Sequence, residues 1–277
     1  PHFRGTLKKA RASGYTLKRA LNDIIDNVIF KAFKIDISTT DDIEDKLNKI
    51  IISDDYMNGF ENIRNTGSSN PFNMAHVRDG HTDDNETSEF GMGLKLAAMY
   101  LGSKLTVYTR IINEDETFSY LSISFDFNDM AIIKEAVNSY EPTSKLTDIS
   151  EEDYLEKHKY DQGSTIIIEN IRPEAYSLKS RHGHQSFDEY IKENITDTYS
   201  NIIVKRNVSI KVNGDEVIPK INYLEHPNCS PLNMETEIKL FIDTDNVNLT
   251  IYGKMTHISG VTKYFTFADN VLEPKKS

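Results

Sequence analysis

Apolar residues recur every three or four positions through residues 17–33, which is the spacing of a helix with one buried face. The apolar positions are Leu17, Leu21, Ile24, Ile25, Val28, Ile29, Ala32 and Phe33. Two further helices are predicted at residues 94–101 and 187–199. Residues 48–55 instead form a short apolar run that ends on two carboxylates, which is typical of a buried strand.

Strand patterns dominate the remainder of the chain. They occupy residues 104–110, 118–127, 164–171 and, in alternation, 235–268. Asn213-Gly214, between two short apolar segments, is a strong signal for a hairpin turn. We expect an α/β fold: a mixed, largely antiparallel sheet with helices on one face, followed by a smaller α/β domain. The boundary is placed near residue 190, which gives domains of residues 1–190 and 191–277.

The composition excludes several classes of protein. It has 277 residues, 38% of them hydrophobic and 27% charged, which suits a globular protein with a sizeable core. No apolar run approaches the roughly 18 residues of a membrane helix, so no membrane partner is expected. A single cysteine, Cys229, excludes an internal disulfide and indicates a reducing compartment, cytoplasmic or nuclear. The net charge of −11 argues against a surface devoted to nucleic acid.

The first candidate motif is on the first predicted helix. Asp23 and Asn27 are four residues apart and so project from one face of that helix. An amide oxygen can ligate Mg²⁺ while a carboxylate orients a water molecule. Alone, such a pair is most often a solvated helix face.

The second motif follows the buried strand at residues 48–55. Asp54 and Asp55 end that strand, and Gly59 comes shortly afterwards. A carboxylate leaving a buried strand needs a donor, such as the amino group of adenine, and a glycine lets a flat base approach the backbone. An ordinary acidic turn is the alternative.

The third motif is Glu89-Phe-Gly-Met-Gly-Leu-Lys95, which runs into the predicted helix at residues 94–101. Gly91 and Gly93 expose the first N–H groups of this helix, which form a site for an anion, and Lys95 adds a positive charge. The spacing is not that of a Walker A loop. Before this motif lies a long aperiodic stretch, up to about residue 89, of the kind that is usually functional or mobile.

The fourth motif, Gln162-Gly-Ser-Thr165, opens a predicted strand and places small hydroxyl groups at its start. In this order, the four motifs resemble the signature of the gyrase, heat-shock chaperone, histidine kinase and MutL (GHKL) ATPases. The resemblance covers residues 15–171 and is strongest to the MORC-like and chaperone-like branch. It implies a Bergerat-type ATP-binding domain, with a transducer-like second domain.

The resemblance also implies a role for each motif residue. Asn27 would ligate Mg²⁺, and Asp23 would act as the general base. Adenine would be held by Asp55, with Asp54 as the neighbouring candidate, by Gly59, and by Ser164 or Thr165. The phosphates and the lid would involve Gly67, Ser68, Phe90, Gly91, Met92, Gly93, Leu94 and Lys95.

The chain departs from the family pattern at two positions. The general base is usually Glu, and Asp23 is one methylene shorter, so we expect slow hydrolysis. Met57 stands where the first glycine of the adenine turn is usual, so the base pocket is expected to be remodelled.

The resemblance implies Mg-ATP binding that orders residues 60–90 and drives homodimerisation, with ATP and ADP as ligands. We expect the chain to be the ATPase part of a larger MORC-like or topoisomerase-like protein, in which DNA is a possible partner. Two alternatives stay open: a nucleotide-binding pseudo-ATPase switch, and an interaction module without nucleotide.

Overall fold

The computed structural model describes residues 15–41, 46–65, 70–72, 93–128, 146–183 and 186–220, together with the backbone of six strands beyond residue 228. The chain divides into two compact units, Pro1–Pro219 and Lys220–Ser277. The sequence placed this division near residue 190. In the structure the segment up to Pro219 belongs to the first unit, because one of its strands pairs with the central sheet.

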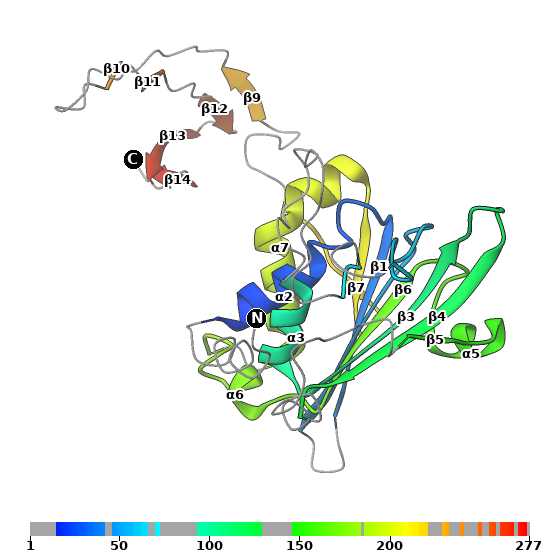
Figure 1. The fold of residues 1–277 in the computed structure, drawn as a ribbon. Helices are drawn as coiled ribbons and strands as arrows, with labels where there is room; N and C mark the ends of the chain where they lie inside the picture. The colour runs from blue at the N-terminus through cyan, green and yellow to red at the C-terminus, as the bar shows by residue number, and fades with distance from the viewer. Residues whose placement is uncertain are drawn as a thin grey trace. The chain divides into compact units, whose positions relative to one another are not determined.

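An eight-stranded sheet forms the body of the first unit, in the order β5-β4-β3-β6-β2-β1-β7-β8 (Figure 1). The strands are β1 (Lys34–Asp41), β2 (Leu47–Asp54), β3 (Lys104–Ile112), β4 (Phe118–Asp126), β5 (Leu146–Asp148), β6 (Ser164–Glu169), β7 (Ser209–Val212) and β8 (Asp215–Glu216). Every neighbouring pair is antiparallel except β1 and β7, which are parallel. The mixed, mostly antiparallel sheet that the sequence predicted is therefore confirmed.

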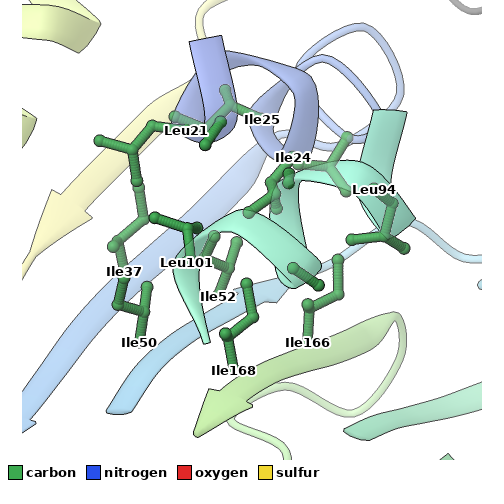
Figure 2. Close-up of a cluster of buried hydrophobic side chains, with 14 of the residues drawn as sticks. Leu21, Ile24, Ile25, Ile37, Ile50, Ile52, Leu94, Leu101, Ile166 and Ile168 are labelled. Atoms are coloured by element: carbon green, nitrogen blue, oxygen red, sulfur yellow. The ribbon is translucent and has the colours of Figure 1, made fainter. Parts of the chain in front are cut away.

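The helices of the first unit are α2 (Leu17–Ile25), α3 (Gly93–Leu101), α5 (Glu151–Lys157), α6 (Pro173–Tyr176) and α7 (Phe187–Arg206). Figure 2 shows α2 and α3 packed on one face of the sheet, against isoleucines of β1, β2 and β6. Ile50, Ile52, Ile166 and Ile168 are at most 1% exposed. Their spacing of two residues along each strand places them all on this face, which we call the helix face.

The opposite face of the sheet is partly covered by α5. The Tyr154 ring of α5 packs on Tyr120 of β4, with a centroid separation of 5.1 Å. Tyr120 pairs with Arg110 across β3 and β4, and Leu121 pairs with Thr109. Because successive residues of a strand alternate between faces, Arg110 lies on the α5 face and Thr109 on the helix face.

The first predicted helix is shorter than its apolar pattern. Its regular part ends at Ile25, although Val28, Ile29 and Ala32 are still buried in the turns that follow. The side chain of Asn27 explains why the regular helix ends. Its amide nitrogen donates to the carbonyl of Asp23, which in a continuing helix would accept the backbone N–H of Asn27. Asparagine competes with helix hydrogen bonds in this way.

Strand β1 was not predicted, because only Ile35 and Ile37 are apolar in a segment otherwise rich in Asp, Ser and Thr. The predicted hairpin is confirmed: Asn213 and Gly214 both have positive φ, +49° and +89°, between β7 and β8. Among the described residues, none of the helices combines the length and the apolar character needed to span a bilayer.

The second unit is made of short strands. They are β9 (Cys229–Leu232), β10 (Lys239–Leu240), β11 (Leu249–Thr250), β12 (Met255–Ile258), β13 (Val261–Ala268) and β14 (Val271–Lys275). Four of them form an antiparallel sheet in the order β14-β13-β12-β9, and β10 pairs with β11. This agrees with the strand patterns seen in that part of the sequence. A transducer-like fold for this unit stays a prediction.

Candidate nucleotide site

Asn27 is fixed by the end of α2. Its Nδ2 donates to the carbonyl oxygens of Asp23, at 2.5 Å, and Ile24, at 3.3 Å. The amide nitrogen therefore faces the helix backbone, and the amide oxygen points away from these carbonyls. A neutral amide oxygen that is held in one orientation is a suitable ligand for Mg²⁺. This ion takes few protein ligands and keeps several water molecules.

Asp23 is held from two sides. The hydroxyl of Tyr15 donates to its Oδ2. Burial, followed by the hydrogen bond and the negative charge of Asp23, raises the pKa of Tyr15 above its usual value. The phenol therefore stays protonated and acts as a donor at neutral pH. Tyr15 also packs edge-on against Tyr100 of α3, with ring centroids 5.4 Å apart.

On its other side Asp23 meets the start of α3. A Cβ atom built on Gly93, the first residue of α3, would lie 3.4 Å from the Cβ of Asp23 and 3.6 Å from its Cγ. The acid of the first motif and the second glycine of the third motif are thus neighbours in space. Free N–H groups at a helix start favour anions, so an anion near this carboxylate would require a bridging cation.

Other residues of the third motif have different positions. Leu94 is a core side chain that Figure 2 shows beside Ile24 and Ile166, so only its backbone is available to a ligand. Lys95 is 4% exposed, and its Nζ donates to the carbonyl of Pro71 at 3.0 Å. Burial lowers the pKa of Lys95 to about 7. The ammonium thus supports the segment at Pro71 in the structure, rather than pointing to a solvated phosphate.

Five of the predicted lid and phosphate-binding residues lie outside the described part of the chain: Gly67, Ser68, Phe90, Gly91 and Met92. Their roles therefore stay predictions.

Asp54 is a buried carboxylate at the end of β2, only 2% exposed. It is on the helix face, because it continues the alternation of Ile50 and Ile52. Its Oδ1 accepts the backbone N–H of Tyr56 at 2.9 Å, and the backbone of Ser164 also donates to it. Burial nevertheless raises the pKa of Asp54 to about 7. Such a carboxylate can accept a further hydrogen bond from a ligand with little competition from water.

The carboxylate of Asp55 accepts backbone hydrogen bonds instead. Its Oδ1 accepts the backbone N–H groups of Phe33, at 2.8 Å, and Lys34, at 2.9 Å. These bonds fix the start of β1 after the turns that follow α2. The structure therefore separates the two candidate aspartates: Asp54 is on the helix face at the strand end, and Asp55 holds the backbone of a neighbouring strand.

Hydroxyl groups from two further strands surround the end of β2. Thr109 of β3 and Ser164 of β6 are hydrogen-bonded at 2.8 Å, and Ser164 pairs directly with Asp54. The backbone N–H of Phe60 donates to Thr109 at 3.0 Å. Thr109 was not among the predicted site residues, although its alternation with Leu105 and Val107 in a predicted strand is a signal that places it on their face.

Gly59 packs against β3 rather than lining an open pocket. It has a φ of +57°, and a Cβ atom here would lie 2.1 Å from the carbonyl oxygen of Arg110 and 2.3 Å from the Thr109 hydroxyl. Both the conformation and the lack of space require glycine. The turn after β2 is thereby fastened to the end of β3.

Thr165 points to the other side of the sheet. Its hydroxyl is 2.8 Å from the hydroxyl of Ser53 and 2.8 Å from Nδ1 of His158. Of the alternatives Ser164 and Thr165, only Ser164 is on the face that carries Asp54. Ser53 and His158 also line a groove of about 290 Å³ that lies on the α5 face, away from Asp54.

Two carboxylates, those of Asp23 and Asp26, lie near the C-terminal end of α2. Burial raises the pKa of Asp26, and the nearby negative charge of Asp23 also raises it, while the hydrogen bond from Tyr199 lowers it. Groups of three or more His, Cys, Asp or Glu side chains able to hold a metal do not occur in the described part of the chain. A cation here would thus be held by Asn27 together with the ligand, not by a cage of protein side chains.

The fold and these residues define an α/β ATP-binding domain of the Bergerat type. A family model described as histidine kinase-, DNA gyrase B- and HSP90-like ATPase matches residues 15–154, just over half of the chain. The chain belongs to this family. The match includes α2, β1, β2, α3, β3, β4, β5 and the first part of α5, and ends before Ser164.

The chain is also similar to solved structures, one of which comes from a topoisomerase II. The ATPase and transducer domains of DNA topoisomerase II from Balamuthia mandrillaris share 14% sequence identity with the chain, with a TM-score of 0.46. The match covers 80% of this chain and 54% of that one, so the chain spans about half of the length of that relative. None of the curated proteins matches.

Proposed function

We propose that this chain binds Mg-ATP between the start of α3 and the ends of β2, β3 and β6, and hydrolyses it slowly. The observation that carries the proposal is the proximity of Asp23 to Gly93. It joins the acidic face of α2 to the N-terminus of α3 in a chain that belongs to an ATPase family.

At the base end, Asp54 accepts a hydrogen from the amino group of adenine. Its burial, its place on the helix face and its bonds to Tyr56 and Ser164 all support this role. The family motif, aligned through Gly59, assigns the same role to Asp55. We prefer Asp54, because Asp55 already accepts two backbone hydrogens of β1.

At the phosphate end, N–H groups at the start of α3 bind the phosphates, together with the predicted contacts of Gly91 and Met92. The oxygen of Asn27 ligates Mg²⁺. When bound, Mg²⁺ neutralises phosphate charge and so allows the anion to lie beside Asp23. Catalysis in this class of reaction rests mainly on positioning and electrostatics.

Asp23 orients the attacking water and accepts its proton. Its side chain is one methylene shorter than that of Glu, which limits its reach and favours slow turnover. Tyr15 donates to one of its two oxygens and so fixes the orientation of the carboxylate. The short reach also supports a second candidate function, a nucleotide-operated switch that binds ATP without hydrolysing it.

Further consequences of ATP binding follow from the family. We propose that ATP orders residues 60–90 and promotes homodimerisation of a larger protein of MORC-like or topoisomerase-like type, in which DNA is a possible substrate. Size-exclusion chromatography with light scattering, with and without a non-hydrolysable ATP analogue, tests dimerisation. A mass that stays monomeric at saturating analogue would exclude it for this chain.

The catalytic assignment is tested by measuring affinity for Mg-ATP and phosphate release on three proteins. They are the wild type, Asn27→Ala and Asp23→Ala. We expect Asn27→Ala to lose Mg-ATP affinity, and Asp23→Ala to keep affinity and lose phosphate release. Wild-type binding without any release would select the switch. Binding and hydrolysis unchanged in both variants would refute the assignment of these residues.

A further inference from the structure

His158 ends α5 on the face of the sheet opposite α2 and α3, and it is only 5% exposed. Its Nε2 is 2.8 Å from the carbonyl oxygen of Gln162, and its Nδ1 is 2.8 Å from the hydroxyl of Thr165. A carbonyl can only accept, so Nε2 carries the proton and Nδ1 accepts the Thr165 hydrogen. Ser53 then donates to the Thr165 oxygen. The imidazole is neutral, and burial lowers its pKa.

The two bonds of this imidazole hold the two ends of the turn from Gln162 to Thr165. Between those ends lie Gly163 and Ser164. Gly163 has a φ of +113°, and a Cβ atom here would lie 1.9 Å from the carbonyl oxygen of Asp54. The backbone of Ser164 donates to the Asp54 carboxylate. A shift of this turn would therefore move Asp54 and one of its donors together.

Helix α5 has few other anchors. Tyr154 is its one buried residue; its ring stacks on His158, with centroids 4.8 Å apart, and its hydroxyl donates to the carbonyl of Gly163 at 3.0 Å. The buried side chains of Tyr154 and His158 thus both bind one turn, the turn at the start of β6. If α5 only packed against the sheet, the hydrogen bonds of Tyr154 and His158 to this turn would not be needed.

We propose that His158 is a positioning residue for the base end of the nucleotide site, acting through the turn at residues 162–165. This inference rests on the proposed binding of ATP with its base at Asp54. The imidazole holds Ser164 and Asp54 in the geometry that adenine requires, from the side of the sheet that the nucleotide does not touch. The phosphate end, built from α2 and α3, does not depend on His158.

Equilibrium binding of two ligands, Mg-ATP and Mg-tripolyphosphate, to a set of variants tests the proposal. His158→Leu removes both imidazole bonds, and Thr165→Val removes the hydroxyl between Ser53 and His158. His158→Gln restores one acceptor and one donor. The matched control is Thr106→Val, which breaks another buried-strand hydroxyl pair on the same face, with Ser124 at 3.0 Å.

We expect His158→Leu and Thr165→Val to weaken Mg-ATP binding by about tenfold, the usual effect of losing a buried hydrogen bond. Binding of Mg-tripolyphosphate should change by less than about twofold, and turnover at saturating ATP should stay near the wild-type rate. His158→Gln should recover part of the affinity, and Thr106→Val should bind both ligands like the wild type.

Equal Mg-ATP affinity in the wild type, His158→Leu and Thr165→Val would overturn the proposal while leaving the proposed function intact. An equal loss for both ligands would also overturn it, since that indicates general destabilisation. If His158→Leu does not fold, the same criteria are applied to Thr165→Val, which conserves the shape of the side chain. A wild type that fails to bind Mg-ATP would refute the proposed function itself.

Discussion

Gly93 and Asp23 are close neighbours: a Cβ atom added to Gly93 would lie 3.4 Å from the Cβ of Asp23. These residues are 70 positions apart in the sequence. This proximity places the start of α3, where we propose that phosphate binds, beside the carboxylate that we propose activates water.

The two aspartates after β2 should respond differently to substitution. Asp54→Asn keeps an oxygen for the Tyr56 N–H but loses the negative acceptor, so we expect at least tenfold weaker ATP binding with little loss of stability. Asp55→Ala leaves the N–H groups of Phe33 and Lys34 without their acceptor. It should lower the free energy of unfolding by about 1–3 kcal/mol. Calorimetric titration and urea denaturation separate the two effects, and the reverse result would restore Asp55 as the adenine acceptor.

The raised pKa of Asp54 predicts a dependence of stability on pH. Its pKa is about 7 in the folded protein, against 3.8 as the usual value. Between these values the folded state binds more protons than the unfolded state, so stability falls as pH rises from about 4 to 7. The slope attributable to this group is at most about 1.4 kcal/mol per pH unit. Urea denaturation across this range should show the slope in the wild type and its loss in Asp54→Asn; equal slopes would contradict the assignment.

Tyr15→Phe removes the hydrogen bond to Asp23 and leaves the aromatic packing on Tyr100 in place. We expect turnover at saturating ATP to fall by about tenfold, because the carboxylate loses its fixed orientation. An effect of this size is expected when one hydrogen bond that positions a catalytic group is lost. The dissociation constant for Mg-ATP should be unchanged. Tyr100→Phe, which alters the neighbouring ring, is the control. A change in affinity with no change in turnover would show that Tyr15 serves binding instead.

Two glycines with positive φ form a matched pair for stability. Gly59→Ala places a Cβ atom 2.1 Å from the Arg110 carbonyl oxygen at a φ of +57°. We expect a loss of about 3–5 kcal/mol from strain and steric overlap. Gly214→Ala has a φ of +89° but nothing within 4 Å, so only the strain of about 1–2 kcal/mol applies. Thermal unfolding of both variants checks the difference, and equal losses would show that the turn after β2 is not fastened to β3.

Much of the fold was predictable because it depends on local patterns. The apolar runs at β2 and β6, the glycines before α3 and the Asn213-Gly214 turn each determine their element with residues close in sequence. Strand β1 was not predicted, because Ile35 and Ile37 are the only apolar residues that indicate a strand there. Its place inside the sheet comes from pairing with β2 and β7. The end of α2 depends on a side-chain bond of Asn27 that no periodicity reveals.

Candidate residues for the site could be named from the sequence, and their roles stay predictions; their orientation could not be predicted. Motif spacing indicated Asp23, Asn27 and the pair at Asp54 and Asp55, but the choice within the pair needs three strands to be placed together. Thr165 is adjacent to Ser164, yet alternation along β6 sends it to the α5 face. His158 has no signal in the sequence, because its partners are defined only once α5 lies on the sheet.

We propose that one nucleotide is bound with its phosphates at α3 and its base at Asp54. Calorimetric titration of the wild type, Asn27→Ala and Asp54→Asn with Mg-ATP and Mg-tripolyphosphate is the decisive measurement. We expect one Mg-ATP per chain, weaker binding of both ligands in Asn27→Ala, and weaker binding of Mg-ATP alone in Asp54→Asn. A wild type without saturable Mg-ATP binding, or two variants that both bind Mg-ATP like the wild type, would contradict it.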